Sequence, residues 1–406
     1  MAYNNLGAFP SMSHPIAGKW QGSAGDGAIA AFEQLISPQK KRRLLRDAPP
    51  EGLFPSRNAS PDTGIIIVNW NSWAETIEAL EAVFRMQDFD GPVVVCDNAS
   101  SDNSLAHIRQ WAEGKLCALP ESRALEIRSL VVPPVAKDFR HSLVSCAQIE
   151  NFDLDEGALE TRLWLVNCAE NLGFGAGSNV GIRLLQRMPS IQNFWLLNAD
   201  ALPEHRAYRE LKNEIPQLRK PVICGSVLME YWKPSEVQSC GARFNPLLCS
   251  MSDNYKGISN TQLRRMDNIY HVDYPVGASL VVNREFLDRV GLMCEDYFLY
   301  FEELDWVMRS GWPSRAFVVT SSRVYHKGGS TTGAGTGGYR NRPLVADYYF
   351  LRSRILFARK SGLLGAVIAA GASVYALLKR SLMCDRSAFS NAFKASVDGF
   401  RSNTGR

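Results

Sequence analysis

The stretch IIIVNWNSWAETIEALEAVFRMQDFDGPVVVCD, residues 65–97, decides the fold. Its two ends, IIIV and VVVC, are short uninterrupted apolar runs, which are typical of strands buried on both faces of a sheet. Between them, Ile77, Leu80 and Phe84 have the spacing of one face of a helix. A strand, a helix and a second strand in this order predict a parallel sheet with right-handed crossovers.

The signals that should begin and end these helices lie beside the apolar runs. Ser72 and Glu75 have the spacing of a capping box at the start of the first helix. Asp102 is placed to cap the helix that follows the second strand. Because Asp102 already accounts for that cap, Asp97 is left for another role.

The same pattern continues along the chain, so we predict an α/β fold with a mostly parallel central sheet and a helical C-terminal tail. Further strands are expected at 163–166, 194–197, 222–228, 278–282 and 316–320, and helices from 347 onward. The expected divisions are a poorly ordered extension (1–61), one α/β domain (62–335) and a basic helical region (336–406).

Charge is distributed unevenly over the 406 residues. The net charge of +4 is too small to indicate a nucleic-acid partner. Residues 340–406, however, contain twelve Lys or Arg and only three Asp or Glu. Such a basic tail favours peripheral contact with an anionic membrane surface, and a solvated basic helix face is the alternative.

One apolar stretch, Gly362–Leu378, lies between basic pairs. It is at the short limit for a membrane span and is rich in Gly, Ala and Ser, so we interpret it as a buried or membrane-lying helix. No secretory leader pattern is found in residues 1–30. The nine cysteines form no C-x-x-C pair, which favours reduced thiols and a cytoplasmic protein. With the basic tail, the expected location is the cytoplasm, in peripheral contact with the inner face of the cell membrane.

Carboxylates follow two of the expected strands. Asp97 and Asn98 end the second strand, and Asn198 and Asp200 follow the strand at 194–197. Ligands of open α/β sheets bind beyond the carboxyl ends of the strands, where Asp97 can accept hydrogen bonds from a nucleotide. Asp200 has the chemistry to bind Mg²⁺ or Mn²⁺. Turn formation is the structural alternative for these residues.

A third acidic segment contains Glu302, Glu303 and Asp305 among aromatic residues. Like charges and apolar surroundings raise the pKa of a carboxyl group, and such a group can remove a proton from a hydroxyl. The alternative is the exposed acidic face of a helix. His326 lies after the expected strand 316–320 and is a possible metal ligand or phosphate donor.

Gly173 begins a glycine-rich segment, residues 173–178, that partly matches a dinucleotide-binding motif. Ser178 stands where that motif needs a third small residue, Gly or Ala, so the match is weak. We interpret the segment instead as a loop whose backbone can approach a ligand closely.

Taken together, these segments resemble the bacterial family-2 glycosyltransferases, close to the rhamnosyltransferase-like branch. The resemblance covers roughly residues 64–332 and is carried by six segments in order: IVNWNS (67–72), VCDNASSD (95–102), ENLGF (170–174), WLLNAD (195–200), VGAS (276–279) and FLYFEELD (298–305).

The resemblance implies a GT-A, Rossmann-like fold that binds a nucleoside-diphosphate sugar, with Mg²⁺ or Mn²⁺ as cofactor. It implies the following site: catalytic Glu303 or Asp305, donor-binding Asn69, Asp97, Asn98, Gly173 and Asn198, and metal-binding Asp200 and His326. Asn198 departs from the family, which has Asp at this position, so either weaker metal binding or a metal held mostly by the substrate is expected.

The implied reaction is an inverting transfer in which a carboxylate deprotonates an acceptor hydroxyl. The donor expected from the resemblance is dTDP-rhamnose, and the acceptor is a glycan or a lipid-linked glycan of cell-envelope polysaccharide biosynthesis. The chain contains no Gln-x-x-Arg-Trp segment, which marks processive synthases, so one sugar per encounter is expected.

Two other functions share some of these features. A nucleotidyltransferase also uses acids at strand ends and a metal, but it needs a glycine-rich phosphate loop after the first strand, where this chain has Asn69-Trp70-Asn71-Ser72. An inactive module that only binds a nucleotide sugar or glycan has no need to keep both an acidic cluster and a metal-site Asp.

Overall fold

The structure is a computed structural model that describes residues 61–401 apart from 153, 219, 312–315, 329–342 and 383–384. The extension predicted for residues 1–61 therefore lies outside the described residues except for its last position. The predicted boundary between residues 335 and 336 also lies outside them.

The described residues form strands and helices that alternate in the first half of the chain. The strands are β1 (Thr63–Asn69), β2 (Val93–Asp97), β3 (His141–Ser145), β4 (Leu163–Asn167), β5 (Asn193–Asn198), β6 (Ala201–Pro203), β7 (Ile223–Glu230), β8 (Val237–Ser239), β9 (Ala242–Asn245), β10 (Ser250–Asp253), β11 (Ile269–Val272), β12 (Ser279–Asn283) and β13 (Ala316–His326). The helices are α3 (Trp73–Val83), α4 (Ser104–Ala112), α5 (Leu125–Val131), α6 (Glu156–Leu159), α7 (Gly173–Gln186), α8 (Ala207–Glu214), α9 (Asn260–Leu263), α10 (Arg284–Val290), α11 (Glu302–Arg309), α12 (Leu344–Arg359), α13 (Gly362–Leu382) and α14 (Arg386–Phe400).

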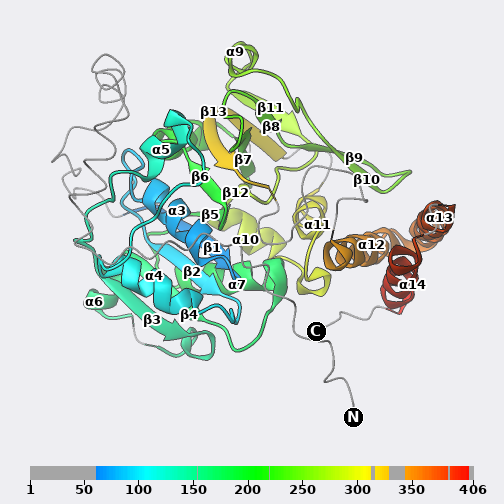
Figure 1. The fold of residues 1–406 in the computed structure, drawn as a ribbon, viewed down its shortest axis with the longest axis horizontal. Coiled ribbons are helices and arrows are strands. Elements are labelled where there is room, and N and C mark those ends of the chain that lie inside the picture. Colours follow the sequence, from blue (N-terminus) through cyan, green and yellow to red (C-terminus); the bar gives the residue numbers. More distant parts are fainter. Residues whose placement is uncertain are drawn as a thin grey trace.

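A single large sheet forms the centre of the molecule (Figure 1). Its strand order is β11-β13-β7-β12-β5-β1-β2-β4-β3, with β6 and β8 paired beside this path. The five strands from β5 to β3 are all parallel to their neighbours, whereas β12 runs antiparallel between β5 and β7. The predicted α/β class with a mostly parallel central sheet is therefore confirmed.

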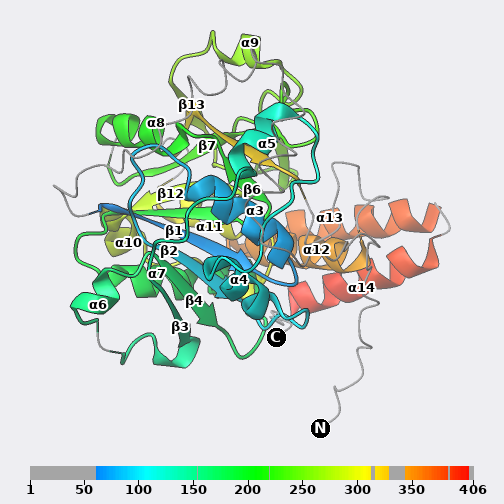
Figure 2. The ribbon, with the colours of Figure 1, turned by 60° about the vertical axis from the view of Figure 1, so that its left-hand side comes forward.

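Helices cover both faces of the parallel strands, which explains their uninterrupted apolar sequences. Right-handed crossovers place α3, between β1 and β2, and α7, between β4 and β5, on opposite faces, because the two connections run in opposite directions along the sheet. α7 lies close to the sheet, since a Cβ added to Gly181 would overlap with the side chains of Ile66 and Cys96. Figure 2 shows α3 and α4 together in front of the strands.

Two local predictions were wrong. The capping box at Ser72 does not form, because its hydroxyl donates to the Trp70 carbonyl (3.2 Å) and accepts no hydrogen bond from the helix. Residues 173–178 are not a loop but the first turns of α7. The Asn171 side chain accepts a hydrogen bond from the Gly173 N–H (3.0 Å), so α7 begins directly after the preceding turn despite its glycines.

The C-terminal helices α12, α13 and α14 pack on one another and extend from one side of the molecule (Figure 1), as the sequence predicts for residues from 347 onward. α12 attaches them to the rest of the chain: Ser353 donates to the Leu299 carbonyl (2.8 Å) and Arg352 to the Asp296 carbonyl (2.8 Å). Among the described helices, α13 alone is long and apolar enough to cross a membrane.

Candidate active site

Polar residues at the carboxyl ends of neighbouring strands meet at one edge of the sheet. In the strand register, Asn69 of β1 lies opposite Asp97 of β2, and Asn198 of β5 lies opposite Val68 of β1. Because adjacent strands are about 5 Å apart, Asp97 and Asn198 lie on strands separated by about 10 Å. The register therefore brings together side chains that are a hundred residues apart in the sequence.

Asp97 is buried and held by three hydrogen bonds. Its Oδ1 accepts from Asn69 Nδ2 (2.6 Å) and from Ser100 Oγ (2.6 Å), and its Oδ2 accepts from the Ser100 N–H (3.1 Å). Asn69 is oriented in turn by Thr76, whose hydroxyl donates to Asn69 Oδ1 (2.8 Å). Since a carboxylate has about four acceptor positions, Asp97 retains capacity for one further donor.

Asn98 and Gly173, two predicted donor-binding residues, contact each other. Asn98 is buried and its Nδ2 donates to the Gly173 carbonyl (2.9 Å). Gly173 has a φ of +81°, and a Cβ there would overlap with the backbone of Phe298. The two residues thus join the end of β2 to the start of α7 and to the segment before α11, a packing role that is evident only in the folded chain.

Replacing Gly173 with alanine is expected to lower the free energy of unfolding by about 2 kcal/mol or more, because a left-handed backbone and an overpacked contact each cost about 1 kcal/mol or more. Denaturant unfolding measures the loss. Gly371 in α13 is the matched control, since a Cβ there meets no atom within 4 Å and alanine favours a helix. Equal stability of the two variants would contradict the contact with Phe298.

Asp200 and His326, the two residues predicted to bind the metal, lie side by side. Asp200 is buried, and its Oδ1 lies 3.2 Å from His326 Nε2. Asn198 lies beside the same nitrogen, with its Nδ2 at 3.5 Å. The pairing of β6 with β13 places Ala201 opposite His326, which explains how residues so distant in the sequence come into contact.

Gln238, which the sequence did not single out, orients the imidazole ring. His326 Nδ1 lies 2.6 Å from Gln238 Oε1, and Gln238 Nε2 donates to the His326 carbonyl (3.1 Å). Nδ1 therefore carries the proton, and Nε2 is directed toward Asp200. Burial lowers the pKa of His326, but the carboxylates around it, Asp200 first and then Glu230 and Asp253, together hold the pKa above its usual value.

Lys327, directly after β13, connects the segment of Asp200 to α3. Its backbone N–H donates to the Asp200 carbonyl (3.1 Å), and its buried Nζ donates to Glu78 of α3 (3.1 Å). The Tyr231 hydroxyl donates to the second oxygen of Glu78 (3.0 Å). Glu78 is one of three glutamates in α3, so no local sequence pattern indicates this network.

Glu303 lies at the start of α11, and its carboxylate rests on the backbone of Gly277. Its side chain is half-buried, and a Cβ on Gly277 would overlap with its Oε1. The next residue, Ala278, accepts a hydrogen bond from the Asn198 N–H (3.2 Å), so Glu303 lies near the end of β5. Burial raises the pKa of Glu303, although the N–H groups of Glu303 and Gly277 partly oppose the shift.

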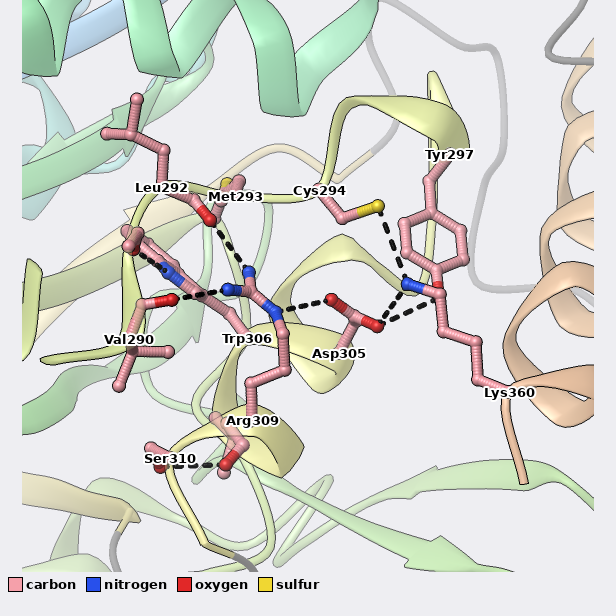
Figure 3. A network of polar contacts seen from close by, with 12 residues as sticks. Val290, Leu292, Met293, Cys294, Tyr297, Asp305, Trp306, Arg309, Ser310 and Lys360 are labelled. Carbon is pink, nitrogen blue, oxygen red and sulfur yellow. Dashed lines mark hydrogen bonds and ion pairs between the residues drawn. The ribbon is translucent and has the colours of Figure 1, made fainter. Parts of the chain in front are cut away.

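Asp305, the other candidate base, is enclosed by partners (Figure 3). Lys360 donates to Oδ1 (2.6 Å), as does the Tyr297 hydroxyl (3.1 Å), and Arg309 donates to Oδ2 (2.9 Å). These contacts join α11 to α12 through Lys360. Of the two carboxylates named from the sequence, Asp305 is therefore enclosed by two cations and a hydroxyl, whereas Glu303 lies against the backbone of Gly277.

Glu302 separates Glu303 from a strained segment. Its side chain is fully buried, its Oε2 has no hydrogen-bond partner among the described residues, and burial together with Glu303 raises its pKa well above the usual value. Phe298, Tyr300 and Phe301 just before it all have positive φ, between 62° and 73°. Bulky residues rarely adopt this conformation, and such strain is concentrated at functional sites.

The donor atoms fit a divalent cation with two protein ligands. A carboxylate oxygen and an imidazole nitrogen converge at Asp200 and His326, and Mn²⁺ accepts both types. Within the described ranges, no group of three or more His, Cys, Asp or Glu side chains is arranged to hold a metal. Any further ligands would come from water or from a bound phosphate group.

No protein-family model and no curated protein matches the chain. Among solved structures, it is similar to GalNAc-T7 with UDP, GalNAc and Mn²⁺ (12% identity, TM-score 0.46), covering 79% of this chain and 56% of GalNAc-T7, about half of that protein's length. It is also similar to the mannosyltransferase PcManGT from Pyrobaculum calidifontis in complex with GDP-Man and Mn²⁺ (14% identity, TM-score 0.43, 94% and 97% covered). A third is S. aureus TarS 1-349 (12% identity, TM-score 0.40, 84% and 92% covered). Because each TM-score is below 0.5, these similarities identify neither a substrate nor a residue's role.

Proposed function

We propose that this chain is a GT-A glycosyltransferase that transfers a sugar from a nucleoside-diphosphate sugar to a hydroxyl group of a glycan or glycolipid, with inversion at the anomeric carbon. The observation that carries the proposal is the convergence at the end of β5, where the Asp200–His326 pair and the Glu303–Gly277 contact both adjoin Asn198. The six sequence segments of the family-2 resemblance supply most of these residues.

The proposed reaction follows from the surroundings of each side chain. Asp97, with one acceptor position left, binds the ribose or base of the donor. Glu303, whose pKa is raised by burial, accepts the proton of the acceptor hydroxyl. The hydroxyl oxygen then forms the new bond to the anomeric carbon as the bond to the diphosphate breaks on the opposite face. A single displacement of this kind inverts the anomeric centre.

Asp200 and His326 would hold a divalent cation at the diphosphate. Such an ion supplies stabilisation of the negative charge that develops on the departing diphosphate. Asn198 adds a polar contact to His326 rather than a carboxylate, so the protein contributes fewer anionic ligands than an Asp at that position would.

A donor panel tests the proposal. Purified chain is incubated with UDP-, GDP- and dTDP-sugars, dTDP-rhamnose among them, with Mg²⁺ or Mn²⁺, and release of free nucleoside diphosphate is measured with and without glycan acceptors. We expect nucleotide sugars of one class to be hydrolysed slowly without acceptor, and to release nucleoside diphosphate faster when the acceptor is present. Absence of turnover for every donor, together with absence of nucleotide binding, would contradict the proposal.

A variant of Gln238 tests the metal site without changing either proposed metal ligand. Replacing it with leucine removes the hydrogen bond to His326 Nδ1 (2.6 Å) and should weaken Mn²⁺ binding by about 10- to 100-fold, as loss of a partner behind a metal ligand typically does. Calorimetric titration with Mn²⁺ and nucleoside diphosphate measures the change. Gln262, exposed in α9, is the matched control, and equal losses in the two variants would contradict the orienting role.

A further inference from the structure

The helices α13 and α14 expose their large apolar side chains and bury small ones. In a helix of a water-soluble protein, large apolar side chains face the core. Here, apart from Arg380, the buried positions are small residues: Gly365, Ala369, Ser373 and Ala376 in α13, and Ala388, Ala392, Ala395, Ser396 and Gly399 in α14. The large apolar side chains face outward: Leu363, Leu364, Val367, Val374, Tyr375, Leu378 and Leu382 in α13, and Phe389, Phe393 and Phe400 in α14.

The outward residues of α13 form one continuous stripe, which we call the α13 stripe. Their spacing places them within less than half of the helix circumference along all 21 residues, a length of about 31 Å. Leu363 and Leu382, at its two ends, are each 85% exposed. Residues 361–378 contain no charged side chain, so nothing polar interrupts the stripe before Lys379.

The tip of the β9–β10 hairpin adds apolar surface beside α13. Leu247 is 75% exposed and Leu248 is 64% exposed. Arg354 of α12 connects this tip to α13, because its carbonyl lies 3.8 Å from Cys249 Sγ and its guanidinium donates to the Ala372 carbonyl (3.2 Å). In Figure 1 the hairpin reaches toward α13. Arg354 therefore links the hairpin, with its two exposed leucines, to α13.

The charges near this surface favour an anionic partner. Residues 344–401 contain nine Lys or Arg and three Asp or Glu, an excess of six positive charges. Arg386, Lys394 and Arg401 are exposed on α14, on the same helix as the outward phenylalanines. A second copy of the chain would bring like charges together, whereas an anionic bilayer takes up both the apolar stripe and the basic residues.

The packing of α13 indicates a helix that lies on the bilayer rather than crossing it. Arg380 near its C-terminal end donates to both oxygens of Asp347 in α12 (2.7 Å each), and both side chains are buried. The small residues of α13 face α12 closely enough that a Cβ on Gly365 would overlap with the Ala358 carbonyl. A crossing helix would give up these contacts with α12 and expose the buried ion pair.

We propose that the α13 stripe, the outward phenylalanines of α14 and the hairpin tip form one surface that docks peripherally on an anionic lipid bilayer. The proposal goes beyond sugar transfer and does not depend on it. It has a consequence for the site, because Lys360 at the end of α12 donates to Asp305 of α11 (2.6 Å) and Ser353 holds the Leu299 carbonyl. Docking therefore sets α11, and with it Glu303, at a fixed position relative to the membrane.

The test is flotation of the full chain with vesicles of phosphatidylcholine containing 30% phosphatidylglycerol, compared with vesicles of phosphatidylcholine alone. We expect binding to the anionic vesicles to be at least tenfold stronger, and to weaken as salt is raised. The triple variant Leu364→Asp, Val374→Asp and Leu378→Asp should lower the vesicle partition coefficient at least tenfold. Thermal unfolding verifies that this variant is folded, which is expected because all three side chains are exposed.

The matched control adds the same three charges elsewhere. Leu119, Leu143 and Leu159 are exposed by 67%, 53% and 53%, and replacing each with Asp should leave vesicle binding unchanged. Three results would overturn the proposal: no binding to anionic vesicles, equal loss in both triple variants, or a bound fraction that resists alkaline carbonate, which indicates a membrane-spanning helix. A dimer in solution that the stripe variant alone dissociates would also overturn it, in favour of a second copy.

Discussion

Replacing Glu303 with glutamine is expected to lower kcat by 100- to 10,000-fold while leaving donor affinity unchanged, the range typical for loss of a general base. Glutamine keeps the size of the side chain and its place against Gly277 but cannot accept a proton. Single-turnover measurements of sugar transfer, together with nucleotide binding by calorimetry, separate the two effects. A fold-intact variant with unchanged kcat would contradict the assignment of the base.

The pH dependence gives a second measurement on the same residue. Burial raises the pKa of Glu303 above the usual 4.5, and only the deprotonated carboxylate can accept a proton. Activity should therefore fall as the pH decreases through this raised pKa, so that the acidic limb of kcat/KM lies above pH 4.5. The limb should be absent from the residual activity of Glu303→Gln.

Asp305→Asn is the control for Glu303, because the two carboxylates are two residues apart but have different partners. Asn at this position loses the charge that Lys360 and Arg309 contact, which should cost about 1–3 kcal/mol of stability. Its kcat should change far less than that of Glu303→Gln. If instead Asp305→Asn abolishes turnover in a folded protein and Glu303→Gln does not, Asp305 is the base.

Replacing Asp200 with alanine is expected to lower kcat/KM at least a hundredfold and to remove the dependence of turnover on Mn²⁺. A bound metal supplies several kcal/mol to the stabilisation of a leaving diphosphate, and about 1.4 kcal/mol corresponds to each factor of ten in rate. His326→Ala should reduce the Mn²⁺ response in the same direction, because the two side chains are 3.2 Å apart. Titration of activity with Mn²⁺ measures both effects.

Asp88 provides the matched control for Asp200, since it is an Asp half-exposed on the surface and paired only with Arg209 (2.7 Å) among the contacts described. Asp88→Ala should leave the Mn²⁺ response unchanged. If Asp200→Ala retains full metal-dependent activity, the assignment of the metal to Asp200 and His326 is wrong. The assignment of Glu303 as the base is tested separately.

The sequence predicted where site residues lie along the sheet, but it did not predict every contact of their side chains. Asp97 and Asp200 follow strands whose apolar runs are readable, so their place at one edge of a parallel sheet follows from strand direction. Asn98 was placed by the same rule, and its side chain donates to the Gly173 carbonyl at the start of α7, a contact that the rule does not predict. Strand direction predicts where a residue lies but not where its side chain points.

The choice between Glu303 and Asp305 shows the same limit. Both carboxylates lie in one aromatic segment, and no local pattern ranks them. The difference arises from partners distant in the sequence: Gly277 for Glu303, and Lys360, directly after α12, for Asp305. The network of Lys327 with Glu78, which are 249 residues apart, was not readable for this reason.

The amino-acid sequence by itself determined the α/β class, the parallel strands and the sheet edge at which the acids lie, because apolar periodicity is a local property of the chain. Only the tertiary structure decided which carboxylate is enclosed by cations, which side chain orients His326, and that α13 exposes its leucines while burying its small residues. These features depend on contacts between elements that are far apart along the chain, and the free energy of burial and pairing at such contacts is set by the folded arrangement.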